Sequence, residues 1–585
     1  MESTWVNSFL LEQTIAHVIS SQAKHGCNFN IPEASRILAV LDKSVARLDR
    51  RLIKLLPPDR VPGIEINKPF KLNGKLTALT EKRLGKDGWT EEEMANVVGP
   101  LTTLPKYIPF DMGKTQKLKE VMYELGWTPD EWNMKKNPWK PFRRTKLSKS
   151  DYTRVLEDMR DDELSDFIDA TTNYYNKHFN LATGKVTEGH RKALLRACGF
   201  VRAPKTLEEY RRHMLQLAFW PTSPQITESS FDSVSKEHGI AMMLLKKRMV
   251  TMHRRGVIAG LLEKRRADGK LSGEANPCAT PTARMTHRII ANIPADGSPL
   301  GARMRALFMG NFDPTDIGGE RSFLNINDGE EHWCNVPDGQ QAFVGGDGAG
   351  LELRMLAHYL VYVPTMLLAN EDYTLFTKTQ LEAALASAIA YRTALLEGDI
   401  HTHNQKLAGL PTRKSAKTFI YAFLYGAGNA NLGAQLGGDV NVGLKARETF
   451  LRECPCIPVL IEYIQWFAAT NGYVPGIDGR QLRLRKDDNG KLMTHKALNL
   501  LLQAAGSIVM KIACRILTEQ IESEQLNCHQ VIFYHDEFQF TCHTTHVARL
   551  RTLIDNCVRL AGEGLDMKCP LASDSKAGAS WLDTH

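Results

Sequence analysis

Cationic and phenolic side chains recur at every fourth position of the segment PTRKSAKTFIYAFLYGAG, at Arg413, Lys417, Tyr421 and Tyr425. This spacing predicts that all four lie on one face of an α-helix. Pro411 fits the first helical turn, because its missing N–H would be unpaired there, and Gly426 and Gly428 supply a stop. Such a face suits a nucleotide, which offers phosphates to the cations and a flat base to the rings. A solvated basic stripe with two half-buried tyrosines would show the same pattern.

Carboxylates stand at two places where strands are predicted to end. The segment AFVGGDGAGLELRMLAHYL reads as a short apolar strand that leads through two glycines to Asp347, with a helix after it. The glycines would allow close approach of backbone or ligand. The segment VIFYHDEFQF reads as two β-rich runs that form a hairpin with acidic residues at its turn, His535-Asp536-Glu537.

Aspartates from two such strands would repel each other unless a cation lay between them. Two Mg²⁺ ions about 3.5–4 Å apart between carboxylates are the usual arrangement for in-line phosphoryl transfer. Each acidic segment alone is weak support, because aspartate in a turn is common. The prediction of a phosphoryl-transfer site therefore rests on the combination of both segments with the cationic helix.

The composition is that of an ordinary globular protein. The chain has 585 residues, 43% of them hydrophobic and 24% charged, which is enough for several domains or one large enzyme with a substantial core. The 74 basic and 66 acidic residues give a net charge of +8. This mild excess is compatible with a nucleic-acid partner without demonstrating one.

Basic residues gather in two places that are candidates for contact with a sugar-phosphate backbone. In KKNPWKPFRRTKLSK, Trp139 and Phe142 stand among cations that include Lys140, Arg143 and Arg144. Cations interleaved with aromatics suit nucleic acid, and a solvated loop explains the charge equally well. A second candidate phosphate track lies on a helix farther along, at Lys246-Lys247-Arg248, Arg254-Arg255 and Lys264-Arg265-Arg266.

The elements that must position these groups change in character along the chain. Periodicity predicts an antiparallel helix pair at about 5–55, irregular chain at 56–108, a helix at 110–127 and mostly helices at 151–270. Short strands, turns and helices follow after about residue 275. The acidic run at 156–170 has helical spacing and reads as a solvated helix face.

The cysteines and apolar segments indicate a reduced, cytoplasmic protein. Eleven scattered cysteines are typical of free thiols, and Cys454 and Cys456 are predicted to be packing residues rather than metal ligands. The N-terminus lacks the pattern of a signal peptide. The apolar segment MLAHYLVYVPTMLLA is interrupted by His358 and Pro364 and is too short to span a bilayer.

The order of the three chemical segments resembles motifs A, B and C of the family A (pol I-like) DNA polymerases. The pattern R-x-x-x-K-x-x-x-Y-x-x-x-Y-G is matched in full by residues 413–426. The segments GDIHTHNQ, GIDGRQLRLR, HKALNLLLQAAG and KAGASWLDTH are similar to the replicative polymerases of bacteriophage T-seven and its relatives. The resemblance covers essentially the whole chain.

This resemblance implies an α+β fold with right-hand polymerase architecture, in which the palm carries an antiparallel sheet and the fingers and thumb are helical. We expect a helical thumb-side region at 1–270 with an irregular insertion at about 56–108, the first part of the palm at 271–400, fingers at 401–475 and the second part of the palm at 476–585. The implied activity is template-directed extension of a primer with dNTPs in phage genome replication.

The resemblance also implies roles for individual residues. Asp347 and Asp536, with the backbone carbonyl of Gly348, would ligate two Mg²⁺ ions, which Mn²⁺ could replace, and Glu537 would support catalysis beside them. The triphosphate would be held by His401, Arg413 and Lys417, and Lys417 would also donate a proton to pyrophosphate. Tyr421 would pack by the sugar and tolerate dideoxynucleotides, Tyr425 would close the base-pair pocket, and Glu352 would fill the space of a ribose 2′-OH. The minor groove or the primer end would be contacted by Arg284, Gln503 and His535.

Two departures from the family pattern put minor contacts in doubt. Ala349 stands where the family usually has serine, so one hydroxyl contact is missing. The segment RMTHRIIANIP is shorter than the usual form, which leaves the template contacts there open.

No strand with the Asp-x-Glu signature of a proofreading exonuclease precedes the thumb-like region. We therefore expect a polymerase without an exonuclease domain. A separate exonuclease subunit, a thioredoxin-like processivity factor or a replicative helicase are candidate partners beside primer-template DNA, and no membrane is expected. Two alternatives stay open, a single-subunit RNA polymerase, against which Glu352 argues, and a non-catalytic DNA-binding subunit with a polymerase-like fold.

Overall fold

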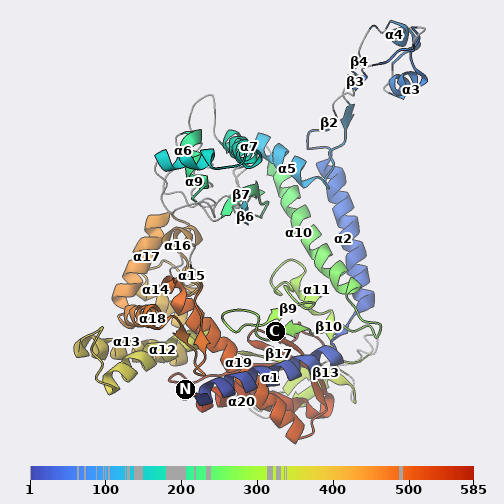
Figure 1. Ribbon diagram of the computed structural model, residues 1–585. Helices are drawn as coiled ribbons and strands as arrows, with labels where there is room; N and C mark the ends of the chain where they lie inside the picture. The colour runs from blue at the N-terminus through green and yellow to red at the C-terminus, as the bar shows by residue number, and fades with distance from the viewer. Residues whose placement is uncertain are drawn as a thin grey trace. The chain divides into compact units, whose positions relative to one another are not determined.

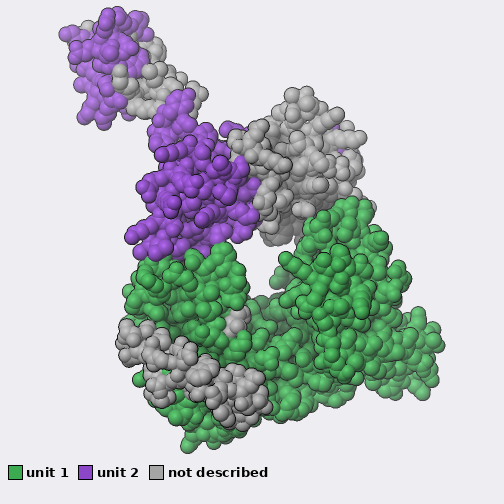
Figure 2. All heavy atoms as spheres, turned by 180° about the vertical axis from the view of Figure 1, so that it is seen from behind, with its two compact units in different colours: residues 1–38, 257–585 green, residues 39–256 purple. Residues whose placement is uncertain are grey.

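The computed structural model describes residues 2–584 except for a set of short segments and one longer one: 62–64, 67, 72–73, 87–88, 97, 99–100, 103–105, 126, 128–131, 137–148, 179–205, 217–218, 229, 232–238, 313–320, 325–330, 335, 337–338 and 487–491. The chain forms two compact units, residues 1–38 with 257–585 and residues 39–256, which are coloured separately in Figure 2. Every residue of the candidate site that the structure describes lies in the first unit.

The first unit holds a four-stranded antiparallel sheet in the order β16-β17-β13-β18. Its strands are β13 (Gln341–Gly348), β16 (Cys528–Tyr534), β17 (Glu537–His543) and β18 (Ser573–Gly578). Helix α20 (Val547–Gly564) packs on one face of this sheet, where a Cβ on Gly346 would meet Ile554 Cγ2 at 2.5 Å. The same Cβ would lie 2.8 Å from the backbone oxygen of Asp574, so Gly346 permits the close approach of backbone that the sequence predicts.

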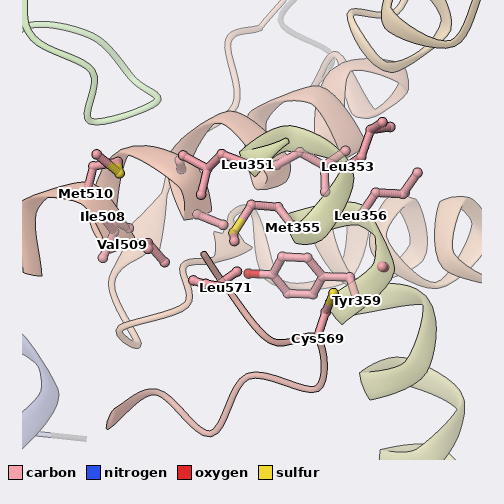
Figure 3. Packing of buried hydrophobic residues seen from close by; sticks show 14 of the residues in the cluster. Leu351, Leu353, Met355, Leu356, Tyr359, Ile508, Val509, Met510, Cys569 and Leu571 are labelled. Atoms are coloured by element: carbon pink, nitrogen blue, oxygen red, sulfur yellow. The ribbon is translucent and has the colours of Figure 1, made fainter. Parts of the chain in front are cut away.

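Helix α19 (Ala497–Ser523) runs through the core of the first unit. It packs against α1 (Glu2–His25), α12 (Leu351–Ala369), α18 (Cys456–Asn471) and α20. Figure 3 shows Leu351, Met355 and Tyr359 of α12 gathered with Met510 of α19. By length and composition, Thr494–Ser523 would qualify as a membrane span, but 72% of its apolar window is buried, as in the core helix of a soluble protein.

The remaining elements of the first unit surround this core. The short strands of this unit are β1 (Asn28–Phe29), β8 (Ala275–Asn276), β9 (Thr286–His287), β10 (Phe308–Met309), β11 (Arg321–Leu324), β12 (Glu331–Cys334), β14 (Val474–Pro475) and β15 (Gln481–Leu482). The helices are α11 (Gly301–Arg305), α13 (Lys378–Glu397), α14 (Ile400–Leu407), α15 (Arg413–Leu424), α16 (Asn429–Gln435) and α17 (Val440–Glu453), with 3₁₀ turns at Thr494–Lys496 and Thr544–His546.

The second unit is mainly helical. A core of buried apolar side chains joins α2 (Ile31–Leu52), α5 (Thr115–Glu124) and α10 (Gly239–Glu263), the two longer of which extend across the unit boundaries. A smaller cluster joins α6 (Lys149–Glu157), α7 (Asp161–His178) and α9 (Leu207–Met214). The remaining elements are β2 (Asp59–Val61), β3 (Glu65–Ile66), α3 (Ala78–Lys86), α4 (Glu91–Ala95), β4 (Leu101–Thr102), β5 (Lys106–Ile108), β6 (Trp132–Lys136) and β7 (Phe219–Pro224).

Three predictions about the N-terminal half need correction. Helices α1 and α2 form as predicted, but α1 packs on α19 and β16 rather than pairing with α2 (Figure 1). Helix α5 begins at Thr115 rather than at 110. In the predicted phosphate track, Arg248 pairs with Asp49 and Arg255 with Asp42, so these two cations connect α10 to α2.

The predicted packing role of the cysteine pair is confirmed. Cys454 and Cys456 are buried, and their sulfurs lie 3.4 Å apart beside the hydroxyl of Ser387. The nine cysteines whose side chains the structure describes are free thiols.

Candidate active site

The predicted acidic residues of motifs A and C meet at one end of the sheet. Asp347 lies near the end of β13, directly opposite Glu537 on β17 and Asp574 on β18. Asp536 lies in the two-residue turn between β16 and β17, and its carbonyl accepts a hydrogen bond of 3.0 Å from the N–H of Gly348. The strand end and the hairpin turn predicted from the sequence are thereby confirmed.

The turn itself is strained. His535 has a φ of 61°, in the left-handed region that residues with a Cβ rarely adopt. Such strain costs about 1–3 kcal/mol and is held by the surrounding structure. At this turn it brings the backbone of Asp536 against Gly348.

The negative charges around Asp536 would be stabilised by a bound cation. Its pKa is raised, first by desolvation among the surrounding protein atoms and then by the negative charges of Asp347, Glu537 and Glu352. Carboxylates that crowd one another in this way are the oxygen donors that a hard divalent ion prefers. Two aspartates offer oxygen donors of the kind that hard divalent cations prefer. In the described part of the chain, no group of three or more His, Cys, Asp or Glu side chains is arranged to hold a metal.

Glu537 is held from within the protein. Its carboxylate is buried, and one oxygen accepts hydrogen bonds from Trp581 Nε1 and, at 2.6 Å, from Gln539 Nε2. The side chain therefore supports the hairpin that carries Asp536.

The cationic helix forms as α15, with one correction at its start. Thr412 is the N-cap, and its hydroxyl accepts from the N–H of Ser415 at 3.1 Å, so Pro411 precedes the first turn. Threonine is a strong N-cap because its oxygen satisfies an otherwise unpaired N–H. The predicted stop is confirmed, since Tyr425 is the C-cap and Gly426 follows with a φ of 76°.

The first turn of α15 meets α14 through an acidic residue that the sequence reasoning missed. Asp399 caps α14 by accepting from the N–H groups of His401 and Thr402, and its other oxygen pairs with Arg413 Nε at 2.6 Å. This contact holds the pKa of Asp399 well below its usual range. The pKa of His401 is lowered by burial and by the charges of Arg413 and Lys417, which confirms that the three predicted phosphate-binding residues lie together.

Farther along α15, the tyrosines face the acidic residues. Burial raises the pKa of Tyr421, and the charges of Glu352 and Asp536 add to this shift. The hydroxyl of Tyr425 donates to Glu352 Oε1, and Arg284 Nη2 lies 3.1 Å from the same oxygen. Motifs A and B and the Arg284 segment therefore converge on Glu352.

Aromatic rings surround the residue predicted to contact the primer end. His535 packs edge-to-face on His287 at 5.3 Å between ring centroids, and His287 also lies 4.4 Å from the ring of Tyr534. Gln503 is half-buried on α19. The three remaining predicted DNA-binding residues, Lys140, Arg143 and Arg144, lie outside the described residues.

Of the residues that the sequence reasoning missed, only Asp399 carried a local signal. Asp399 directly precedes a helix and could have been read as an N-cap from that position. Ala283 precedes the singled-out Arg284, but nothing in its type indicates its left-handed φ of 55°. Trp581 lies 44 positions from Glu537, which no local pattern connects.

An antiparallel sheet with paired aspartates at its end, faced by a helix of cations and tyrosines, is the arrangement expected of a nucleotidyl-transfer enzyme. A family model described as DNA polymerase family A matches residues 332–583. The DNA-directed DNA polymerase of Escherichia phage Phieco32 is 40% identical over an alignment of 617 residues that covers 99% of each chain. The chain therefore belongs to the family A DNA polymerases and is a DNA-directed DNA polymerase.

Other relatives match part of the chain. The DNA-directed DNA polymerase of Escherichia phage T7 is 32% identical over 343 residues, which cover 54% of this chain and 42% of the T7 protein. The POL domain of Pol1 from M. smegmatis, solved with DNA primer-template and dNTP, aligns at 17% identity with a TM-score of 0.49, covering 80% of this chain and 70% of that one. The family membership decides against the RNA polymerase and non-catalytic alternatives.

Proposed function

We propose that this chain extends a DNA primer on a DNA template with dNTPs during phage genome replication, by the two-metal mechanism of nucleotidyl transfer. The observation that carries the proposal is the hydrogen bond from the hydroxyl of Tyr425, at the end of α15, to Glu352 in the first turn of α12, the helix that follows Asp347. This contact joins α15, the helix predicted to bind the nucleotide, to the segments that carry the acidic residues. A triphosphate held by α15 would then lie next to the carboxylates.

The donor set supports two metal ions. Asp347, Asp536 and the carbonyl of Gly348 would hold Mg²⁺, with Mn²⁺ as a substitute. When bound, the ions would supply a lowered pKa at the primer hydroxyl and neutralisation of the triphosphate. Glu537 would keep the Asp536 turn in place through its bond to Trp581.

The triphosphate of the incoming dNTP would be bound by His401, Arg413 and Lys417. Lys417 is exposed and, among the described residues, makes no ion pair like that of Arg413 with Asp399. It would donate a proton to the departing pyrophosphate. Arg413, held at its Nε by Asp399, would keep its terminal nitrogens for phosphate oxygens.

Sugar and base would be selected by the cluster at Glu352. Its carboxylate, fixed by Tyr425 and Arg284, would fill the space that a ribose 2′-OH requires. Tyr421 would pack by the deoxyribose, and Tyr425 would close the base-pair pocket. Arg284 would also reach the minor groove or the primer end together with Gln503 and His535, and Lys140, Arg143 and Arg144 would contact the sugar-phosphate backbone.

The partners would be primer-template DNA and dNTPs. We propose that this chain does not proofread, so that a separate exonuclease subunit, a thioredoxin-like processivity factor or a replicative helicase would complete the replication machinery. Incubation of the purified chain with a labelled single-stranded primer tests the point. Exonucleolytic shortening that persists in Asp347→Asn would contradict the absence of proofreading.

Primer extension with Mg²⁺ tests the proposed site. We expect Asp347→Asn and Asp536→Asn each to lower kcat by about a hundred- to a thousandfold, in the range of groups that stabilise the transition-state charge directly. Asp574→Asn is the matched control, because Asp574 is exposed and lies directly opposite Asp347 on β18. Equal activity of Asp536→Asn and the control variant would refute the assignment.

A further inference from the structure

The backbone next to Arg284 is held in an unfavourable conformation. Ala283 has a φ of 55°, a left-handed conformation that its Cβ disfavours. Strain of this kind persists only where surrounding contacts determine the conformation. Ala283 directly precedes Arg284, whose guanidinium pairs with Glu352.

Two donors on α19 hold the carbonyl of Ala283. Lys511 Nζ and Ser507 Oγ each donate to this oxygen at 2.8 Å. A carbonyl oxygen has two lone pairs, so the two donors satisfy it fully. Gln503, Ser507 and Lys511 follow one another at every fourth position and lie on one face of α19.

Lys511 is an unusual donor because it is a fully buried cation. Its side chain is 0% exposed, and the other two hydrogen bonds of the ammonium go to the carboxylate oxygens of Glu12 on α1, at 2.8 and 2.7 Å. Arg480 Nη1 also reaches Glu12 at 2.7 Å. Burial lowers the pKa of Lys511, and Glu12 opposes this shift. All three ammonium hydrogens therefore have acceptors.

Thr280 closes the backbone turn that contains Ala283 and Arg284. Its hydroxyl accepts from the N–H of Arg284 at 3.0 Å and donates to the carbonyl of Arg284 at 3.2 Å. The backbone of Arg284 is thus fixed on one side by Thr280 and on the other by the anchored carbonyl of Ala283. These bonds fix the point from which the Arg284 side chain leaves the backbone, and Glu352 holds its guanidinium.

We propose that Lys511 is a positioning residue that, together with Ser507, sets the direction of Arg284 by anchoring the strained carbonyl of Ala283. The inference rests on the proposed contact of Arg284 with the minor groove at the primer end. Glu12 serves this arrangement by neutralising the buried ammonium.

The test uses the full chain and a primer whose terminal base lacks a minor-groove acceptor. Adenine N3 is such an acceptor, and 3-deazaadenine removes it. Extension from a terminal adenine is compared with extension from 3-deazaadenine, as kcat/KM for the next dNTP. In the native enzyme we expect the substitution to lower kcat/KM by about ten- to a hundredfold, the effect of one hydrogen bond to a charged donor.

Four variants separate the possible outcomes. Arg284→Ala should abolish the sensitivity to 3-deazaadenine, and Lys511→Met should reduce it in the same direction. Ser507→Ala removes the other donor to Ala283 without leaving a charge unpaired, so it keeps the test valid if Lys511→Met folds poorly. Arg480→Met is the matched control, because Arg480 shares Glu12 with Lys511 but does not contact Ala283.

The results divide as follows. Reduced sensitivity in Lys511→Met, or in Ser507→Ala where Lys511→Met folds poorly, supports the proposal when Arg480→Met keeps native sensitivity. Native sensitivity in a folded Lys511→Met, while Arg284→Ala has lost it, overturns the proposed role of Lys511 but leaves the minor-groove contact of Arg284 standing. Native sensitivity in Arg284→Ala refutes the proposed minor-groove contact, and the inference about Lys511 falls with it.

Discussion

Replacement of Trp581 by phenylalanine tests the support beneath the catalytic turn. Trp581 is 2% exposed, and its Nε1 donates to Glu537, which is itself only 6% exposed. The ring packs edge-to-face on Phe308, and the guanidinium of Arg305 lies 4.7 Å from its centroid. Phenylalanine would retain part of this ring packing but would remove the donor.

The expected loss of stability has two parts. A hydrogen bond to a buried charged group contributes about 1.5–3 kcal/mol. The smaller ring leaves a cavity that adds about 1–2 kcal/mol. We therefore expect Trp581→Phe to lower the free energy of unfolding by about 3 kcal/mol or more, which is large for a single substitution.

Urea unfolding followed by far-ultraviolet circular dichroism measures this loss, with Trp466→Phe as the matched control. Trp466 is 36% exposed and its ring contacts Tyr463, so its replacement should cost under about 1 kcal/mol. A chain of two units can unfold in more than one transition, and the transition that Trp581→Phe shifts is the one to compare. If the two variants lose equal stability, the bond from Trp581 to Glu537 does not support the turn. We also expect kcat for primer extension to fall in Trp581→Phe, because Glu537 adjoins Asp536.

Three further predictions concern sugar selection, the phosphate site and pH. Glu352→Ala should raise the incorporation of rNTPs relative to dNTPs, measured as the ratio of kcat/KM values, and an unchanged ratio would show that this carboxylate does not exclude the 2′-OH. Asp399→Asn keeps the N-cap but weakens the pairing with Arg413, so KM for dNTP should rise several-fold with little change in kcat; a lowered KM would mean that Asp399 competes with the triphosphate. Burial lowers the pKa of His358 to about 4, while the unfolded value is near 6.5, so its contribution to stability is present above pH 6.5 and is lost as the pH falls toward 4. Urea unfolding at pH 7 and pH 5 should differ by about 2 kcal/mol from this group, and His358→Asn, which keeps an acceptor for the N–H of Lys568, should reduce the difference.

The sequence was sufficient where the signal is local. A period of four places Arg413, Lys417 and Tyr421 on one helix face, and apolar runs that end in Asp347 and flank Asp536 predict a strand end and a hairpin. These inferences need only the geometry of a helix and a strand. The error at Pro411 is also local, since proline and threonine both favour helix starts and the hydroxyl of Thr412 supplies the stronger cap.

The contacts that orient the site are not local and could not be predicted from the sequence. Lys511 and Glu12 are 499 positions apart, and Arg284 and Glu352 are 68 apart. Pattern rules for helices and strands relate residues a few positions apart, so they cannot pair such groups. The left-handed conformation of Ala283 is equally hidden, because alanine is neither a turn former nor favoured at positive φ.

The buried pair of Lys511 and Glu12 raises a final question, which is whether it contributes stability or geometry. Replacing a buried ion pair with well-packed apolar residues is often neutral or stabilising by about 1–4 kcal/mol, because no charge has to be desolvated. We therefore expect the double variant Glu12→Leu/Lys511→Met to be at least as stable toward urea as the native chain, whereas Lys511→Met alone leaves the carboxylate with only Arg480 and should be less stable. The double variant should still show reduced sensitivity to 3-deazaadenine, because Ala283 keeps only the donor from Ser507. A double variant that is stable and fully sensitive would show that the ion pair has no part in directing Arg284, and one less stable than the single variant would show that the pair is there for stability.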